Sequence, residues 1–275
     1  MADATGEKIE KVGNLIAGYG SVLVALSGGV DSSLLLSLAA RTLPGRVKAA
    51  FARSVLNPPG EYEAARATAA GMGVDLIVLD FDPLAIEAVR YNALDRCYHC
   101  KKGLARRLLA QAEDLGLLSV LEGSHGDDAF SYRPGARALL ESGMKSPLKE
   151  AGLTKTEIRQ TAQALGLAMW NKPPGACLAT RFPYETVLTP DNLDQVRRAE
   201  ILLAAEGLIG ARARHHGDIL RLELPPQFLP RLAEEPLRAR LLETLTGLGF
   251  RFITADLAGY RPGVFDQAPA GMEDG

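Results

Sequence analysis

The 275-residue sequence has little of what marks a secreted, membrane-spanning or fibrous protein. It has three cysteines, too few for a disulfide scaffold, and their odd number favours a reducing compartment. Its longest apolar runs, such as 21–26 and 115–121, are too short to cross a bilayer. The charged segment 1–13 lacks the apolar region of a signal peptide. We therefore expect a cytoplasmic protein.

Excess charge of one sign is also absent. The chain has 31 Lys and Arg residues against 33 Asp and Glu residues, a net charge of −2, and only 6% aromatic residues. No overall basic field or aromatic-rich face therefore points to nucleic acid. Apolar residues make up 47% and charged residues 23%, as in an ordinary globular protein.

What the sequence does contain is a regular alternation of strand-like and helical segments. We predict strands at 21–27, 47–51, 75–81 and 119–122, and helices at 8–17, 31–41, 61–72, 102–115 and 154–165. Thr154 with Glu157 three residues later forms a capping box at the start of the last helix. This alternation predicts an α/β fold with a doubly wound parallel sheet.

The rhythm changes after Pro190, which indicates a second, smaller α+β domain. A helix is predicted at 193–206, strand-like alternation at 212–224, a helix at 227–245 and a strand at 251–255. We expect domains at 1–185 and 186–262, a linker near 182–190, and a frayed tail at 263–275. His215 and His216 are interpreted as a surface turn.

The segment SGGVDS, residues 27–32, lies between the first strand and its helix. Gly28 and Gly29 allow a tight turn that brings backbone N–H groups against an anion, and the helix N-terminus adds unpaired donors. The alternative is an ordinary Gly-Gly turn, common at junctions between a strand and a helix, without a bound anion. No Gly-Lys-Ser/Thr follows, so this is not a Walker loop. Ser27, Ser32 and Ser33 can add hydroxyl donors to a phosphate, and Asp31 can hold Mg²⁺.

A strand, SGGVDS and a helix in this order resemble the PP-loop ATP pyrophosphatase superfamily, which has the adenine nucleotide alpha hydrolase-like fold. The resemblance implies that ATP is cleaved between its α and β phosphates, with transfer of AMP to an oxygen of the substrate. The ATP-binding residues that it implies are Ala25, Leu26, Ser27, Gly28, Gly29, Asp31, Ser32, Ser33, Gly123 and Asp127. It says almost nothing about which substrate.

The three cysteines form one CxxC pair, Cys97 and Cys100, and a distant Cys177 in a Pro- and Gly-rich segment. Three thiolates can hold a 4Fe-4S cluster with one iron open to an exogenous sulfide. A structural zinc site would need His99 or His125 as a fourth ligand. Buried apolar cysteines are the remaining alternative.

The combination of motifs is similar to the LarE family, sulfur transferases of nickel-pincer nucleotide synthesis. The shared segments are the PP-loop, CYHCK at 97–101, GSHGDD at 123–128, KSPL at 145–148 and PGACLATR at 174–181. The resemblance implies adenylation of a carboxylate of pyridinium-3,5-biscarboxylic acid mononucleotide and its conversion to a thiocarboxylate. One branch sacrifices the sulfur of a cysteine at the Cys177 position. Another uses cysteines at the Cys97, Cys100 and Cys177 positions for a 4Fe-4S cluster, and this chain has all three.

Such a nucleotide substrate also needs an anion site outside the PP-loop. Arg212 and Arg214 are two residues apart in a strand-like segment, so they share a face and can bind a phosphate through bidentate hydrogen bonds. The resemblance implies phosphate binding by Arg212 and Arg214, with Glu200 orienting an arginine. Solvated surface arginines are the alternative. The residues assigned to catalysis are Cys177, Asp31 and Arg181, the last also as an anion contact.

Three other functions compete with this one. A PP-loop tRNA thiolation enzyme also combines a CxxC with a third cysteine, but it should have a basic RNA-binding face. An ATP-dependent amide ligase needs no cysteine, and a nucleotide sensor with structural zinc would release no pyrophosphate. The LarE resemblance further implies a homo-oligomer, such as a hexamer, and a nickel enzyme that uses the product. Trp170 is either core or a wall of the substrate site.

Overall fold

A computed structural model describes residues 2–127, 134–172 and 175–261. Asp128, Pro174 and the predicted tail at 263–275 lie outside these ranges. The chain divides into two compact units. Unit 1 consists of Met1–Ser54, Gly60–Pro83 and Asp95–Gly175, and unit 2 of Val55–Pro59, Leu84–Leu94 and Ala176–Gly275. No described helix is both long enough and apolar enough to cross a bilayer.

Unit 1 contains the predicted doubly wound α/β fold, built on a four-stranded sheet whose strands all run parallel. The strands are β1 (Val22–Ala25), β2 (Val47–Arg53), β3 (Leu76–Asp80) and β4 (Ser119–Leu121). In the sheet their order is β3-β2-β1-β4, so the chain first builds to one side of β1 and then crosses to the other. Ligands of open α/β folds bind at the carboxyl ends of the strands where this reversal occurs. Here that position lies between β1 and β4.

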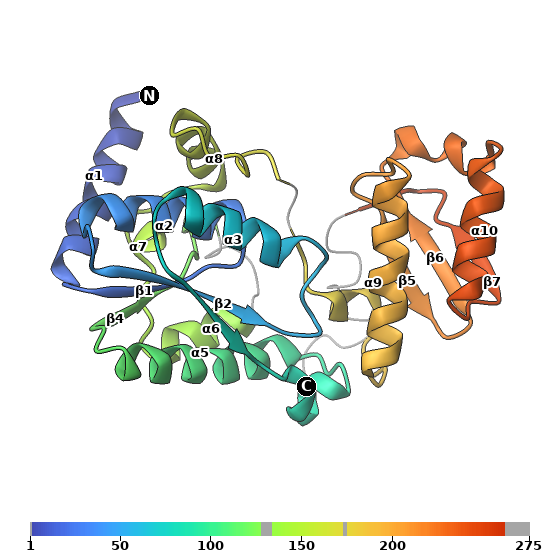
Figure 1. Cartoon of the computed structure of the whole chain (residues 1–275), viewed down its shortest axis with the longest axis horizontal. Helices are drawn as coiled ribbons and strands as arrows, with labels where there is room; N and C mark the ends of the chain where they lie inside the picture. The colour runs from blue at the N-terminus through green and yellow to red at the C-terminus, as the bar shows by residue number, and fades with distance from the viewer. Residues whose placement is uncertain (1, 128–133, 173–174, 262–275) are drawn as a thin grey trace, which may run out of the picture. The chain divides into compact units, whose positions relative to one another are not determined.

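Helices cover both faces of this sheet (Figure 1). The side that carries α2 (Val30–Thr42) also holds α1 (Ala2–Gly18), α3 (Glu61–Gly71), α7 (Pro147–Glu150) and α8 (Lys155–Ala164). The other side holds α5 (Arg96–Asp114) and α6 (Pro134–Ser142). The predicted helix at 102–115 therefore begins earlier, at Arg96, and α6 is an element that the sequence reading did not include.

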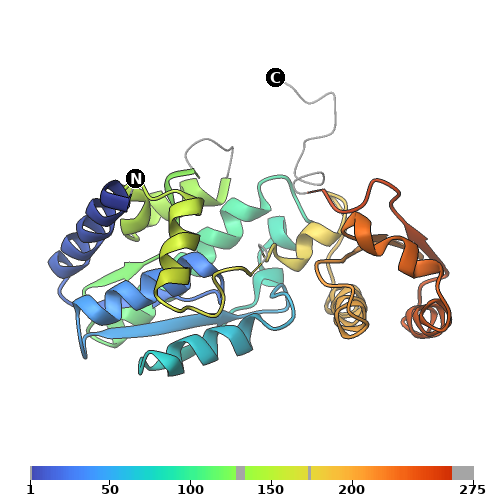
Figure 2. The same ribbon diagram turned by 90° about the horizontal axis from the view of Figure 1, so that it is seen from above.

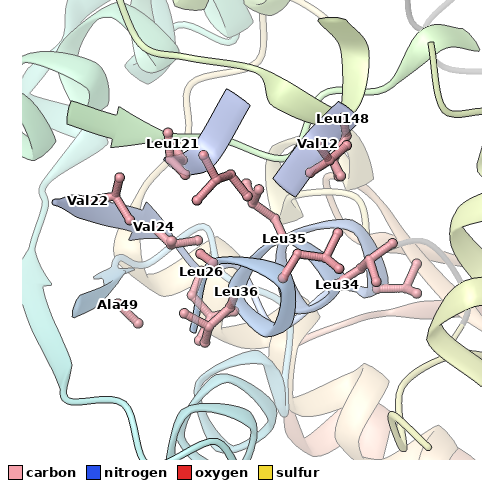
Figure 3. Packing of buried hydrophobic residues seen from close by; sticks show 14 of the residues in the cluster. Val12, Val22, Val24, Leu26, Leu34, Leu35, Leu36, Ala49, Leu121 and Leu148 are labelled. Carbon is pink, nitrogen blue, oxygen red and sulfur yellow. The ribbon is translucent and has the colours of Figure 1, made fainter. Parts of the chain in front are cut away.

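The alternation of β1 divides the core into two layers. Val22 and Val24 belong to the cluster with α2, and Leu23 belongs to the cluster with α5. Figure 3 shows Val22 and Val24 beside Leu35 and Leu121, all buried. A strand covered on both faces needs apolar residues at every position, which explains why its sequence reads as a continuous apolar run.

The capping box predicted at Thr154 is confirmed. Thr154 Oγ1 accepts from the backbone N–H of Glu157, and Glu157 accepts from the backbone N–H of Thr154. Glu157 also accepts from Lys8 Nζ at 2.7 Å, which links α8 to α1. One carboxylate thus both starts α8 and attaches it to the first helix.

Unit 2 contains a three-stranded sheet of β5 (Arg212–His216), β6 (Ile219–Glu223) and β7 (Phe252–Ala255). β5 and β6 are antiparallel, and β6 and β7 are parallel. Two helices, α9 (Pro190–Ala205) and α10 (Leu237–Gly247), lie on one face of the sheet, and Figure 2 views both of them end-on. The strand-like alternation at 212–224 is therefore a β-hairpin.

The single helix predicted at 227–245 is wrong. That segment contains two short 3₁₀ turns, η4 (Pro226–Phe228) and η5 (Pro230–Ala233), before α10 begins at Leu237. Pro226, Pro230 and Pro236 each lack the N–H that a helix interior requires. The helical spacing of the apolar residues thus could not produce one continuous helix.

Two short excursions from the first half of the chain belong to unit 2. One contains α4 (Glu87–Arg90), which follows the 3₁₀ turn η1 (Pro83–Ala85). Asn92, fully buried, donates from its side chain to the carbonyls of Phe182 and Pro183. The backbone N–H of Leu188 donates to the carbonyl of Arg90. The segment 182–190, expected as a linker, is therefore fastened inside unit 2.

The interpretation of His215 and His216 as a surface turn is also wrong. Both lie in β5 and are half-buried, and the His215 ring stacks on Phe182 with centroids 4.9 Å apart. Burial lowers the pKa of both imidazoles from 6.5. His215 therefore acts as part of the apolar layer under α9.

Acid should weaken the attachment of α8 to α1. Burial alone would raise the pKa of Glu157, but hydrogen bonds from Lys8 and Thr154 outweigh it and hold the pKa at about 2. A carboxyl with a depressed pKa stabilises the folded state above its unfolded value of 4.5, and this contribution fades as the pH falls toward 2. Urea unfolding between about pH 6 and pH 3 should therefore show a smaller pH dependence in Glu157→Gln than in the wild type. An identical dependence would contradict the assignment.

Candidate active site

The PP-loop makes its sharpest turn at Gly28, directly after β1. Gly28 has φ +77°, and a Cβ built on it would lie 2.5 Å from the backbone oxygen of Glu61 at the start of α3. Gly29 has φ −92° and is the N-cap of α2. The turn therefore requires glycine at position 28 for two reasons, the left-handed backbone and the close approach of α3.

Hydroxyl groups hold the shape of this loop. Ser32 Oγ accepts from the backbone N–H of Ser27 at 3.1 Å and donates to the carbonyl of Gly29 at 3.2 Å. The hydroxyls of Ser27 and Ser32 also lie 3.1 Å apart. Ser33 is fully buried in α2, so its side chain belongs to the core beneath the loop. Ala25 and Leu26 form the end of β1 that leads into the turn, and Leu26 N–H donates to Ala50.

The segment after β4 lies against the same turn, as the strand order requires. A Cβ on Gly123 would lie 3.1 Å from the backbone nitrogen of Ser32. Asp127 accepts from the backbone N–H of Lys155 at 2.7 Å. Lys155 Nζ in turn donates to both carboxylate oxygens of Asp31, at 2.6 and 2.5 Å. Asp31 and Asp127 are hard oxygen donors at one sheet edge, a donor set that suits Mg²⁺.

Two lysines that sequence reasoning did not select contact the loop. Besides Lys155, Lys172 Nζ donates to the carbonyl of Gly28 at 3.1 Å. Arg159 on α8 donates to the carbonyls of Trp170 and Lys172, which holds this segment in place. Trp170 packs against the core of unit 1. The capping box at Thr154 could have drawn attention to Lys155, because it places this lysine in the first turn of a helix.

The cysteines are divided between the units. Cys97 and Cys100 lie near the start of α5, three residues apart and thus on one face of the helix. Cys97 is exposed, and Cys100 and Cys177 are partly exposed. Cys177 belongs to unit 2, at the N-cap of the 3₁₀ turn η3 (Leu178–Arg181). Among the described residues, no group of three His, Cys, Asp or Glu side chains is assembled for a metal ion.

Arg181 fastens the segment that carries Cys177. Arg181 is 1% exposed, and its guanidinium forms two hydrogen bonds with Glu200, at 2.7 and 3.1 Å. It also donates to the carbonyl of Ala176 and to Thr180 Oγ1. Glu200 accepts in addition from the backbone N–H of Ala213 in β5. The structure thus joins the Cys177 segment, α9 and the hairpin through one buried ion pair.

Arg212 and Arg214 share a face of the small sheet, as their spacing predicts. The register pairs Arg212 with Glu223 and Arg214 with Arg221, so all four side chains lie on that face. Arg214 is buried and donates twice to Glu223, at 2.9 and 2.7 Å, and once to the carbonyl of Thr180. Sequence reasoning did not select Glu223. The strand-like alternation over 212–224 could have indicated it, because it places Glu223 on the face of the hairpin that carries the arginines.

Arg212 is the more accessible of the pair. It is half-buried and lies over the ring of Tyr260 at 5.3 Å. Burial lowers the pKa of Arg212, and the positive charge of Arg181 lowers it further. A bound anion would offset both effects, because it would replace lost hydration and oppose the neighbouring charge.

Gly28→Ala should disrupt the loop far more than Gly29→Ala. The first change forces a left-handed alanine, about 1–3 kcal/mol of strain, and places its Cβ against Glu61. At Gly29 the nearest atom is Ser27 Oγ at 3.4 Å and φ is ordinary. We expect Gly28→Ala to weaken binding of an ATP analogue at least about tenfold, measured by calorimetry. Equal losses in the two variants would show that the turn geometry is not limiting.

Arg181→Met should destabilise unit 2 strongly. The change leaves the carboxylate of Glu200 buried without its partner, a loss of about 3–5 kcal/mol. Arg198→Met is the matched control, because Arg198 only approaches Asp194 at 4.0 Å on the surface and should cost about 0–1 kcal/mol. Urea unfolding measures both, and similar values for the two variants would contradict a structural role of the buried pair.

Comparison with known proteins agrees with this geometry. A family model described as asparagine synthase matches residues 12–188. A Lactiplantibacillus plantarum protein named pyridinium-3,5-bisthiocarboxylic acid mononucleotide synthase is 39% identical over 244 residues, 88% of this chain and 87% of the relative. The uncharacterized protein slr1717 of Synechocystis is 37% identical over 93% of this chain and 96% of its own length. A tRNA-specific 2-thiouridylase of Methylobacterium nodulans is 29% identical over 72% of this chain and 61% of its own length.

The family match covers the strands, the PP-loop and most of the helices of unit 1. The two relatives with the higher identities extend the similarity through unit 2, where the buried arginines lie. The chain therefore belongs to the LarE family, the ATP-dependent sulfur transferases within the PP-loop ATP pyrophosphatase superfamily.

Proposed function

We propose that this enzyme adenylates a carboxylate of pyridinium-3,5-biscarboxylic acid mononucleotide and converts it to a thiocarboxylate. The observation that carries the proposal is the glycine-dependent PP-loop with Asp31, in a chain 39% identical to a named bisthiocarboxylic acid mononucleotide synthase. We place the protein in the cytoplasm, as a homo-oligomer such as a hexamer that supplies a nickel enzyme. The expected domain ranges 1–185 and 186–262 give way to the two units described above, in which Ala176–Gly275 belongs to unit 2.

Adenylation is assigned to unit 1. A carboxylate oxygen of the substrate attacks the α-phosphorus of ATP, and the bond from that phosphorus to pyrophosphate breaks. The backbone N–H of Gly28 and the N-terminus of α2 would bind the phosphates. Asp31, with Asp127 close by, would hold Mg²⁺, which when bound neutralises phosphate charge. The acyl-adenylate that results has AMP as a good leaving group.

The substrate phosphate is assigned to Arg212 and Arg214. Glu200 orients an arginine, Arg181, which stays proposed as a catalytic residue and an anion contact. Support comes from the shared strand face and from the crowding of positive charge at Arg212. Glu223 holds Arg214 in place through two hydrogen bonds, so a phosphate would meet an ordered guanidinium. Burial and the fixed geometry reduce the entropy lost when the anion binds.

The sulfur-transfer step is assigned to the cysteines. A sulfur nucleophile attacks the acyl carbon, the bond from that carbon to the AMP oxygen breaks, and AMP leaves. Cys97, Cys100 and Cys177 are proposed to hold a 4Fe-4S cluster, which when bound supplies an iron open to exogenous sulfide. The thiolate donor set and the shared helix face of the CxxC pair suit such a cluster. The alternative is that Cys177 gives up its own sulfur and becomes dehydroalanine.

When the protein is incubated with ATP, Mg²⁺ and the biscarboxylic acid mononucleotide, it should release AMP and pyrophosphate and form a thiocarboxylate. Mass spectrometry detects the thiocarboxylate product. Cys177→Ala should still release pyrophosphate but form no thiocarboxylate, because only the second step needs the thiol. Thiocarboxylate formation by Cys177→Ala at the wild-type rate would point to another nucleophile. Stimulation of pyrophosphate release by tRNA in place of the mononucleotide would favour tRNA thiolation.

The sulfur source is tested by iron, sulfide and zinc analysis of protein purified without oxygen. About four irons per chain, lost in Cys97→Ala and Cys100→Ala, would support the cluster. A metal-free active protein whose mass falls by about one H₂S per chain, as the cysteine becomes dehydroalanine, would instead establish Cys177 as the donor. Zinc alone would contradict both routes and indicate a structural site.

A further inference from the structure

The KSPL segment, residues 145–148, has no task in the steps proposed above, yet it lies beside the strand that ends at the nucleotide site. The backbone N–H of Lys145 donates to the carbonyl of Val120 in β4, and the carbonyl of Lys145 accepts from the backbone N–H of Glu122, both at 2.9 Å. Leu148 is fully buried in the core cluster that contains α2. The segment is therefore fixed to the sheet by its backbone and to the core by a side chain.

Ser146 does not use its hydroxyl as its position in the chain suggests. It is the N-cap of α7, where a serine commonly accepts from a backbone N–H in the first turn of the helix. Within α7, which the structure describes in full, no such hydrogen bond forms. The hydroxyl instead donates to the carboxylate of Glu122, directly after β4. A contact 24 residues away in the chain has replaced the local cap.

Glu122 joins this serine to the segment that follows β4. The residue is 7% exposed, and one carboxylate oxygen accepts from Ser146. The other oxygen accepts from the backbone N–H of Ser124 at 2.9 Å and from its hydroxyl at 2.8 Å. In the described part of the chain the donors to this carboxylate are all neutral. Their hydrogen bonds compensate for the burial of the carboxylate, so the position requires acceptors more than a charge.

The residue between these two, Gly123, is the one that lies against the PP-loop. A Cβ on Gly123 would lie 3.1 Å from the backbone nitrogen of Ser32 in the first turn of α2. Because Glu122 and Ser124 are its chain neighbours, the hydrogen bonds between them fix the backbone of Gly123. The fit of the segment after β4 on the PP-loop thus depends on a carboxylate that lies behind it.

We propose that Glu122 and Ser146 are positioning residues of the nucleotide site. Through Ser124 they hold Gly123 against the PP-loop, so that ATP meets the loop and the segment after β4 in one fixed arrangement. This inference rests on the proposed use of ATP, and neither side chain is assigned a contact with the nucleotide. The KSPL segment thereby has a task, which is to supply the hydroxyl that orients Glu122.

The test measures binding of α,β-methylene-ATP with Mg²⁺ to variants of the full-length protein by calorimetry. Glu122→Met removes every acceptor and should bind the analogue about tenfold more weakly. Glu122→Gln should keep the wild-type affinity, because its amide oxygen accepts from Ser124 and its amide nitrogen donates to Ser146, whose hydroxyl can also accept. Ser146→Ala removes one hydrogen bond and should bind about threefold more weakly.

A second measurement needs no nucleotide. Amide hydrogen exchange, followed by mass spectrometry, should be faster in Glu122→Met than in wild type over residues 122–127 and also over the PP-loop, residues 27–32. Faster exchange over 27–32 would report that the PP-loop loses order when the contact behind Gly123 is removed.

Glu150→Met is the matched control. Glu150 is exposed and also accepts from Ser146, but from its backbone N–H, at 3.3 Å, and not from the hydroxyl that reaches Glu122. This variant should keep both the wild-type affinity and the wild-type exchange over 27–32. Circular dichroism at the binding temperature reports whether each variant is folded.

Wild-type affinity in Glu122→Met, or an equal loss in Glu122→Gln, would overturn the assignment. Where Glu122→Met does not fold, Ser146→Ala decides by its affinity and by its exchange over 27–32. If wild type itself does not bind the analogue, the proposed function fails, and exchange alone decides this inference. Unchanged exchange over 27–32 in Glu122→Met would then overturn it, and faster exchange there would support it.

Discussion

The left-handed turn at Gly28, pressed against the backbone of α3, is the constraint on which the nucleotide site depends. It lets the chain pass from β1 into α2 within a few residues, so the loop leads directly into a helix N-terminus, where anions bind. The close fit of Gly123 on Ser32 then brings the end of β4 to the same turn. A side chain at either glycine would separate elements that must be in contact.

The two units handle charge in different ways, and the difference matches their assigned tasks. Unit 1 places single lysines against the PP-loop, Lys155 at Asp31 and Lys172 at the carbonyl of Gly28. Unit 2 buries Arg181 with Glu200 and Arg214 with Glu223, each through paired hydrogen bonds. Paired hydrogen bonds hold each arginine in one orientation, whereas a lysine ammonium is a point charge at the end of a flexible side chain.

Much of unit 1 could be predicted from sequence, because its elements repeat a strong local pattern. All four strands and the capping box at Thr154 are where the pattern placed them, to within a few residues. The failures occur where local pattern and covalent geometry disagree. Prolines interrupt the helical spacing at 227–245, and His215 reads as a polar turn residue although it stacks on Phe182 in a strand. Asn92 holds unit 2 together over 90 residues of sequence, which no local pattern reports.

The sequence by itself determined the type of site, because SGGVDS acts through its own backbone and needs only the strand before it and the helix after it. It also determined that Arg212 and Arg214 share a face, because strand alternation is a local property. Only the tertiary structure decided which charges meet. Lys155 reaches Asp31 across 124 residues, and Lys172 reaches Gly28 across 144. Contacts at such separations follow from sheet order and helix packing, and a charged side chain on a helix surface gives no local sign of the partner that folding will bring to it.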